Sequence, residues 1–300
     1  MAHYFFKFKT KQMKKLLSVM TLVLFFASCK KNNDSNQKLN LNITGLEDLG
    51  ANFRYEGWLL VGGSPVSTGT FSVNAGGTLS ATSFDVDKNT LGNATDFVVT
   101  IEPFPDANPA PTATHILSGS FSGGTANISV GDAKSLGNNF TSATGKYVLA
   151  TPSNGMPSNE KSGIWFIDLA SGSPAVGLTL PALPAGWKYE GWAVIGTTPV
   201  TTGKFTTVTG IDNAAPYYSG TMVPPFPGED FLINAPAGLT FPTDLSGGKA
   251  VITIEPEPDN SPAPFLLKPL VGNISATAMD HVTYTMPNNA ASFPTGTVTR

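Results

Sequence analysis

An internal repeat constrains the fold of this chain more than any other feature of its sequence. The tetrapeptide Tyr-Glu-Gly-Trp occurs at 55–58 and again at 189–192, and further blocks recur after it in the same order. The spacing is 134 residues at this tetrapeptide but 153 between Glu102 and Glu255, so the second copy carries 19 additional residues. A constant block order indicates a tandem duplication. The other recurring blocks are 65–71 with 199–205, 100–103 with 253–256, 105–106 with 258–259 and 109–111 with 262–264.

Each copy has the pattern of short β-strands. Aromatic and β-branched runs end at Gly or Pro, and no stretch after the first thirty residues keeps a helical apolar spacing over twelve residues. The pattern predicts an all-β fold of two tandem β-sandwich-like domains. We expect the first domain at 39–160 and the second at 161–300, with the insertion as a loop around 210–246. The predicted strands include 55–61, 69–73, 97–101, 126–130, 163–169, 192–195, 203–208 and 250–254.

The first 29 residues predict a lipoprotein signal peptide. Lysines precede an apolar run of roughly a dozen residues at 16–26, which is too short to cross a bilayer core comfortably. Small residues then precede Cys29, an arrangement that resembles a lipobox, so Cys29 is the predicted lipidation site. It is the only cysteine of the chain, which excludes a disulfide framework in the exported body. Either Met1 or Met13 is the start.

Residues 30–38 are polar and predict a tether to the membrane. Cys29 followed by Lys and Asn is similar to the surface-export signal of Bacteroidetes lipoproteins. We therefore expect a lipid-anchored protein of the outer membrane, either periplasmic or surface-exposed. The formal net charge of −3 becomes more negative without the basic signal, which excludes the basic surface that nucleic acid binding requires.

The block order resembles the extracytoplasmic C-terminal domain of anti-sigma-K-type factors. The resemblance rests on a Tyr-x-x-Trp strand, Gly-x-Pro-Val-x-x-Gly-x-Phe, and a β-branched strand ending in Ile-Glu-Pro, and it covers roughly 39–130 and 175–280. Those factors grip the sigma factor with a cytoplasmic N-terminal domain, followed by a transmembrane helix. Here a signal peptide precedes the β-domains, so the resemblance implies an extracytoplasmic module without sigma-factor sequestration by that route.

Paired carboxylates are the residues that could carry chemistry. Glu56 and Glu102 correspond to Glu190 and Glu255, and two carboxylates at the right separation can hydrolyse a glycosidic bond. A carboxylate at a strand end before proline more simply accepts hydrogen bonds from turn amides, and this is our expectation. The acidic residues at 85–96 approach the spacing of a calcium loop but have Thr90 where that loop needs Gly, so we expect a polar hairpin.

The remaining candidates also favour structure over catalysis. Trp58 and Trp192 lie in apolar strands and are expected in the core, with exposed sugar-stacking platforms as the alternative. His115 and His281 occupy non-equivalent positions without a Ser elbow or His-x-x-x-His spacing. No catalytic residue, metal site or cofactor is predicted.

The sequence leaves three functions open. The first is a non-enzymatic cell-envelope lipoprotein that acts as an interaction or sensing module, with an envelope protein as its partner. The second is a glycan-binding accessory lipoprotein, which would need exposed aromatic residues in a groove. The third is an envelope hydrolase, which would need carboxylates in a concave pocket.

Overall fold

The structure is a computed structural model that describes residues 1, 35–155, 157–214, 216–220 and 223–300. The predicted signal peptide, Cys29 and the tether as far as Asp34 lie outside the described residues. Asn36 to Arg300 form one compact unit. Within the described part of the chain, no helix combines the length and apolarity needed to cross a membrane.

Strands dominate this unit, which confirms the predicted mainly β class. The strands are β1 (Asn36–Thr44), β2 (Phe53–Val61), β3 (Ser64–Phe71), β4 (Ser83–Asp87), β5 (Ala94–Pro103), β6 (His115–Ser122), β7 (Thr125–Ser129), β8 (Thr144–Leu149), β9 (Gly163–Trp165), β10 (Ile167–Asp168), β11 (Ala175–Val176), β12 (Leu178–Thr179), β13 (Trp187–Ile195), β14 (Thr198–Phe205), β15 (Gly228–Asp230), β16 (Lys249–Pro256), β17 (Leu270–Asn273), β18 (Tyr284–Met286) and β19 (Thr295–Thr299). The helices are α1 (Lys88–Asn93) and two single 3-10 turns, Glu160–Ser162 and Ala290–Ser292.

The first lobe, defined as the strands β1–β7 and β19, is one antiparallel sheet in the order β3-β2-β5-β6-β7-β19-β1-β4. The sheet nearly closes into a barrel, because Phe71 at one edge and Phe84 at the other bring their ring centroids within 6.4 Å. Burial alternates along β1, where Leu39, Leu41 and Ile43 point into the core. The sandwich-like prediction is therefore only partly right, since one curved sheet encloses this core.

The second lobe, defined as β8–β18, contains three sheets. One has the strand order β14-β13-β16-β17, and a second has the order β12-β8-β9-β15 with β18 also paired to β8. The third is the small pair β10-β11. β13 pairs with β14 and β16 as β2 pairs with β3 and β5. The insertion around 210–246 contributes the short strand β15.

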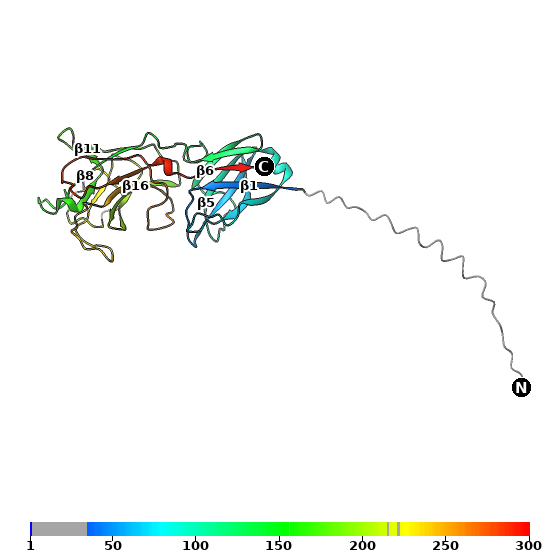
Figure 1. Cartoon of the computed structure of the whole chain (residues 1–300), viewed down its shortest axis with the longest axis horizontal. Helices are drawn as coiled ribbons and strands as arrows, with labels where there is room; N and C mark the ends of the chain where they lie inside the picture. Colours follow the sequence, from blue (N-terminus) through cyan, green and yellow to red (C-terminus); the bar gives the residue numbers. More distant parts are fainter. Residues whose placement is uncertain (2–34, 156, 215, 221–222) are drawn as a thin grey trace. The chain divides into compact units, whose positions relative to one another are not determined.

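The last strand of each half pairs within the other lobe. β19 lies between β1 and β7, and Figure 1 shows this red C-terminal strand among the blue and cyan strands. β8, from residues expected in the first domain, pairs instead with β12 and β18. β12 precedes β13 in the second lobe as β1 precedes β2 in the first. Because β8 pairs with β12 and β19 pairs with β1, β8 occupies in the second lobe the place that β19 occupies in the first.

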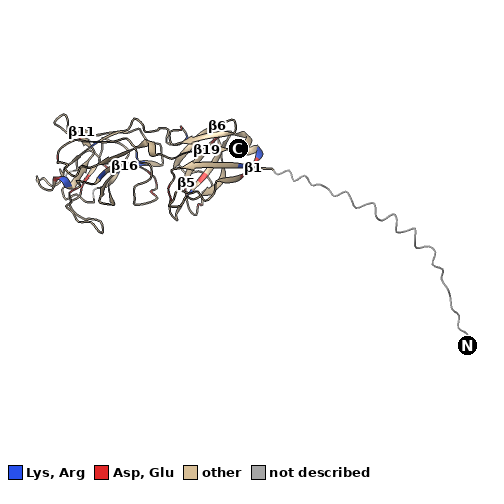
Figure 2. Ribbon diagram, in the orientation of Figure 1, with Lys and Arg blue, Asp and Glu red and all other residues tan. Residues whose placement is uncertain are grey.

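Charged side chains are sparse along the ribbon (Figure 2). Charged residues make up 13% of the chain, and several of its carboxylates are buried. Burying a carboxylate is costly unless hydrogen bonds or a counter-charge compensate. These buried acids therefore mark the places where function could reside.

Candidate functional site

The two Tyr-Glu-Gly-Trp strands form matching local structures. Tyr55 pairs with Phe71 and Tyr189 with Phe205, and the ring centroids of these stacked pairs lie 5.5 and 5.6 Å apart. Each strand shifts register directly after its glycine, at Gly57 and Gly191. The extra residue of each bulge lies on the partner strand, at Thr68 of β3 and Thr202 of β14. The glutamate before each glycine and the tryptophan after it share one face by the ordinary alternation of a strand.

The tryptophans of both strands are buried, which confirms their predicted place in the core. Trp58 Nε1 donates to Thr100 Oγ1 at 2.8 Å, and Trp192 Nε1 donates to Thr253 Oγ1 at 2.9 Å. The Thr100 hydroxyl in turn donates to the Glu102 carboxylate. The indoles thus anchor the threonines next to the buried glutamates, and neither is exposed for stacking on a sugar ring.

Three carboxylates converge in the second lobe. Oxygens of Glu190, Glu255 and Asp259 all lie within 4.8 Å of one another. Glu190 is 5% exposed and Glu255 is fully buried, and one oxygen of each accepts no hydrogen bond. Lys204, opposite Glu190 in the β13–β14 register, places Nζ 2.8 Å from Asp259 Oδ2. An ammonium group therefore provides the counter-charge for this cluster.

Burial governs the protonation of these acids. Burial, helped by the neighbouring charges of Glu190 and Asp259 and opposed by hydrogen bonds, raises the pKa of Glu255 to about 8. The pKa of Glu190 is also raised by burial, although the Thr201 hydroxyl and the Lys204 ammonium lower it. Glu255 is thus mainly protonated at neutral pH.

The first lobe has the corresponding acids with similar hydrogen bonds but with threonine in the place of Lys204. Glu56 accepts from the Ser67 hydroxyl, and buried Glu102 accepts from Thr112 N at 3.0 Å as well as from Thr100. The residue opposite Glu56 in the register is Thr70, where the second lobe has Lys204. A hollow of about 280 Å³ opens here, and it is lined by Glu56, Trp58, Ser67, Asp106, Ala107, Asn108 and Pro109.

The turn-amide prediction is confirmed for the two glutamates that precede proline. Thr112 N donates to Glu102, and Phe265 N donates to Glu255 Oε1 at 2.9 Å. Glu56 and Glu190 instead accept from the hydroxyls of Ser67 and Thr201. A glycosidase needs carboxylates that reach the substrate from both sides of the scissile bond. The buried pair Glu190 and Glu255 does not meet that requirement.

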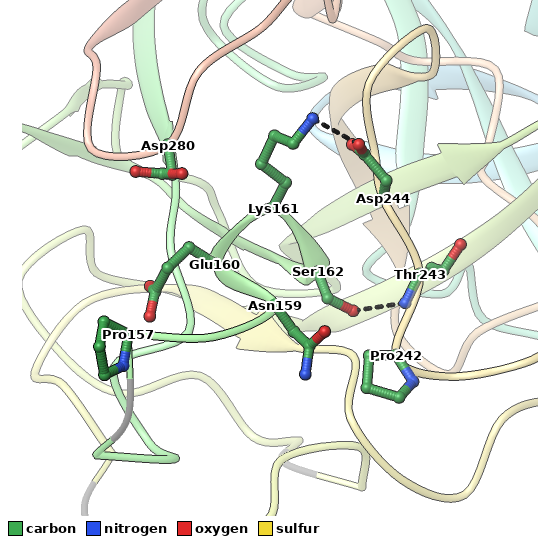
Figure 3. Close-up of a pocket in the computed structure, with 9 residues that line it drawn as sticks. All are labelled: Pro157, Asn159, Glu160, Lys161, Ser162, Pro242, Thr243, Asp244 and Asp280. Carbon is green, nitrogen blue, oxygen red and sulfur yellow. Dashed lines mark hydrogen bonds and ion pairs between the residues drawn. The ribbon is translucent and has the colours of Figure 1, made fainter.

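A larger hollow of about 350 Å³ lies near the 3-10 turn Glu160–Ser162 (Figure 3). Two pairs of its polar residues are bonded to each other: Lys161 with Asp244, and Ser162 Oγ with Thr243 N at 2.7 Å. Ser162 Oγ also donates to the carbonyl of Phe231. A hydroxyl engaged in this way, with no base bonded to it, is not an activated nucleophile. The lining residues are Pro157, Asn159, Glu160, Lys161, Ser162, Pro242, Thr243, Asp244 and Asp280.

The histidines and the calcium-like segment have structural contacts. His115 Nδ1 lies 2.8 Å from the carbonyl of Lys134, and His281 lies beside Asp280. Asp87 caps α1 by accepting from Asn89 N and Thr90 N, so a short helix replaces the expected hairpin. The acids of this segment do not converge: Asp85 binds Lys38 and Asp96 binds Ser120 and Lys134.

The sequence did not reveal a second group of buried acids, formed by Asp212 and Glu229 with Asp230. Burial raises the pKa of Asp212 to about 7 and that of Glu229 to about 8. The charge of Asp212 adds to the rise at Glu229, and the charge of Glu190 adds to the rise at Asp212. Asp230 accepts from Ser153 N and Trp165 Nε1. These acids lie in the inserted segment, which has no counterpart in the first copy and hence no repeat signal.

The family model described as anti-sigma-K factor rskA, C-terminal, matches residues 30–116. The matched segment contains Glu56, Trp58, Glu102 and Asp106, and it ends within β6. The matched domain is non-catalytic, and it accounts for only part of the chain. Comparison with curated proteins and with solved structures gives no match.

Proposed function

We propose that this protein is a non-enzymatic lipoprotein of the cell envelope whose tandem anti-sigma-factor-like extracytoplasmic domains act as an interaction or sensing module. The match of residues 30–116 to the anti-sigma-K factor C-terminal domain carries the proposal. Acyl chains on Cys29 anchor the protein to the outer membrane, since several chains together give stable attachment. The protein then acts outside the cytoplasm through a partner.

The likeness of the two lobes supports a duplication of this module. β2–β3 and β13–β14 share their register, their bulge and their stacked Tyr–Phe pair. Tyr55 Oη donates to the carbonyl of Glu47, and Tyr189 Oη donates to the carbonyl of Pro181, at the same spacing of eight residues. Two related modules on one anchor increase the avidity for a partner without new chemistry.

The state of the acids and aromatic residues argues for interaction over the alternatives. Among the described residues, two of the three converging carboxylates, Glu190 and Glu255, are buried, and the third, Asp259, is paired with Lys204. The serine of the larger hollow is hydrogen-bonded to Thr243 N and to the carbonyl of Phe231. Burial of Trp58 and Trp192 removes the repeated aromatic platform that glycan binding would use. Glycan binding is therefore an outcome of the test below and not a second proposal.

The experiment is affinity capture with the full-length protein, expressed in a bacterial host, extracted in detergent and carrying a C-terminal tag. Metabolic labelling with an alkyne fatty acid should mark the wild type and not the Cys29→Ser variant. Envelope extract should yield a protein partner that is retained reproducibly. Retention of a purified glycan without any protein partner, or turnover of that glycan, would refute the proposal.

A further inference from the structure

The two lobes differ in the residue that pairs with the glutamate of the Tyr-Glu-Gly-Trp strand. Lys204 stands opposite Glu190 in the second lobe, and Thr70 stands opposite Glu56 in the first. The three carboxylates that converge in the second lobe each have a counterpart in the first: Glu56 for Glu190, Glu102 for Glu255 and Asp106 for Asp259. Glu257, which lies farther along the same loop, corresponds to Phe104. The second lobe thus has an internal ammonium group where the first has a hydroxyl.

The second lobe shows how the site holds an ammonium group. Lys204 is 16% exposed, and its Nζ donates to Asp259 Oδ2 at 2.8 Å. The charges of Asp259, Glu190 and Glu257 all favour the charged form of this lysine over the cost of its burial. Asp259 therefore binds the ammonium directly, and Glu190 favours it through its charge.

The first lobe has the corresponding carboxylates without the ammonium. Thr70 is too short to supply one. Arg54, the nearest cation along β2, is committed elsewhere: its guanidinium lies 4.4 Å from the centroid of the Phe104 ring and donates to the carbonyls of Gly50 and Phe53. The carboxylates of Glu56 and Asp106 line the 280 Å³ hollow, beside the Trp58 indole and Pro109.

We propose that this hollow, bounded by Glu56, Trp58, Asp106 and Pro109, receives a lysine side chain of a partner protein in the place that Lys204 occupies in the second lobe. The carboxylates hold the ammonium, and the methylene stem packs along the Pro109 ring and the edge of the Trp58 indole that lines the hollow. An acetylated lysine has no charge for these carboxylates and is excluded. This inference deepens the proposed interaction function and rests on it.

The test uses the full-length lipoprotein in detergent with ¹⁵N-labelled tryptophan, which gives one indole resonance for each of its four tryptophans. The probe is Nα-acetyl-lysine methylamide, and its Nε-acetylated form is the neutral control. We expect the lysine probe to shift the Trp58 resonance saturably, with a Kd of about 1–10 mM as suits one small side chain. Trp58→Phe identifies the resonance by its loss.

Two reciprocal variants distinguish the proposal from a general acid effect. Thr70→Lys should fill the hollow from within and weaken the response of Trp58 at least about tenfold. Lys204→Thr should open the second site, so that the Trp192 resonance becomes responsive. The unchanged positions of the other indole resonances report that each variant is folded.

Three results would overturn the inference: no saturable Trp58 shift with the lysine probe, an equal shift with the acetylated probe, or a stronger shift with calcium chloride than with the amine. None of them depends on a captured partner. If the lysine probe gives no response but affinity capture retains a protein partner, the inference fails and the proposed function stands. If the probe gives a response but no partner is captured, the lysine site stands and the proposed function fails.

Discussion

Truncation of Val298 in the C-terminal strand should weaken the first lobe, although Val298 lies at the far end of the sequence from that lobe. Its side chain is fully buried, and β19 pairs Val298 with Leu41 on one side and Ala126 on the other. Val298→Ala removes two methyl groups at about 1 kcal/mol each, including the cavity they leave, so we expect a loss of about 2 kcal/mol.

Hydrogen exchange with mass spectrometry can locate this loss. A decrease of about 2 kcal/mol in the opening free energy corresponds to exchange about thirtyfold faster, and it should appear in β1 and β7. Val148→Ala is the matched variant, because Val148 is a fully buried valine of β8. It should accelerate exchange in β9 and β18 instead. Faster exchange at β13 and β16 in Val298→Ala, with β1 unchanged, would refute the strand assignment.

Three further predictions follow from single contacts. Stability should fall as pH rises from about 4.5 to about 8, because burial raises the folded-state pKa values of Glu229 and Glu255 from 4.5 to about 8, so their stabilising contribution is fully present below the unfolded value and is lost as pH rises to the folded one; urea titrations at each pH measure it, and Glu255→Gln should flatten the fall. Gly57→Ala should cost about 1–3 kcal/mol, because its Cβ would lie 2.7 Å from the Phe97 ring, whereas Gly92→Ala in α1, with nothing within 4 Å, should be neutral or stabilising in the same denaturation assay. Trp58→Phe should cost about 1–2 kcal/mol by removing the bond to Thr100, measured by thermal melting, and an unchanged melting temperature would contradict that role.

The strand pattern of the sequence predicted the local structure well where apolar residues are dense. Residues 55–61 and 97–101 lie in β2 and β5, and 192–195 and 250–254 lie in β13 and β16. Burial of the tryptophans followed from the same apolar runs. The prediction at 203–208 extended too far, since β14 ends at Phe205. The alternation continues there in the sequence, but the pairing of β14 with β13 ends at Phe205 and Tyr189. The first two residues of β13, Trp187 and Lys188, pair only with β16.

The candidate site was predictable only in part, for a physical reason. The repeat identified Glu56, Glu102 and their counterparts, because their neighbours are hydrophobic and invariant between the copies. The role of Lys204 depends on its place opposite Glu190, and that register is set by a bulge that no local pattern encodes. The acids Asp212 and Glu229 come together across an irregular loop, so their proximity depends on tertiary packing alone.

The exchange of β8 and β19 explains why the chain behaves as one unit between Asn36 and Arg300. Each strand follows its own repeat in sequence but fills a gap in the other lobe, where a central sheet position has hydrogen-bonding partners on both sides. Without β19, β1 and β7 would both have unpaired edges, and Arg300 would lose its bond to the carbonyl of Ala94. If the chain were divided at residue 160, neither half would contain all the strands of its own sheet. It follows that the two carboxylate sites belong to one compact unit, in which each lobe depends on a strand from the other half of the sequence.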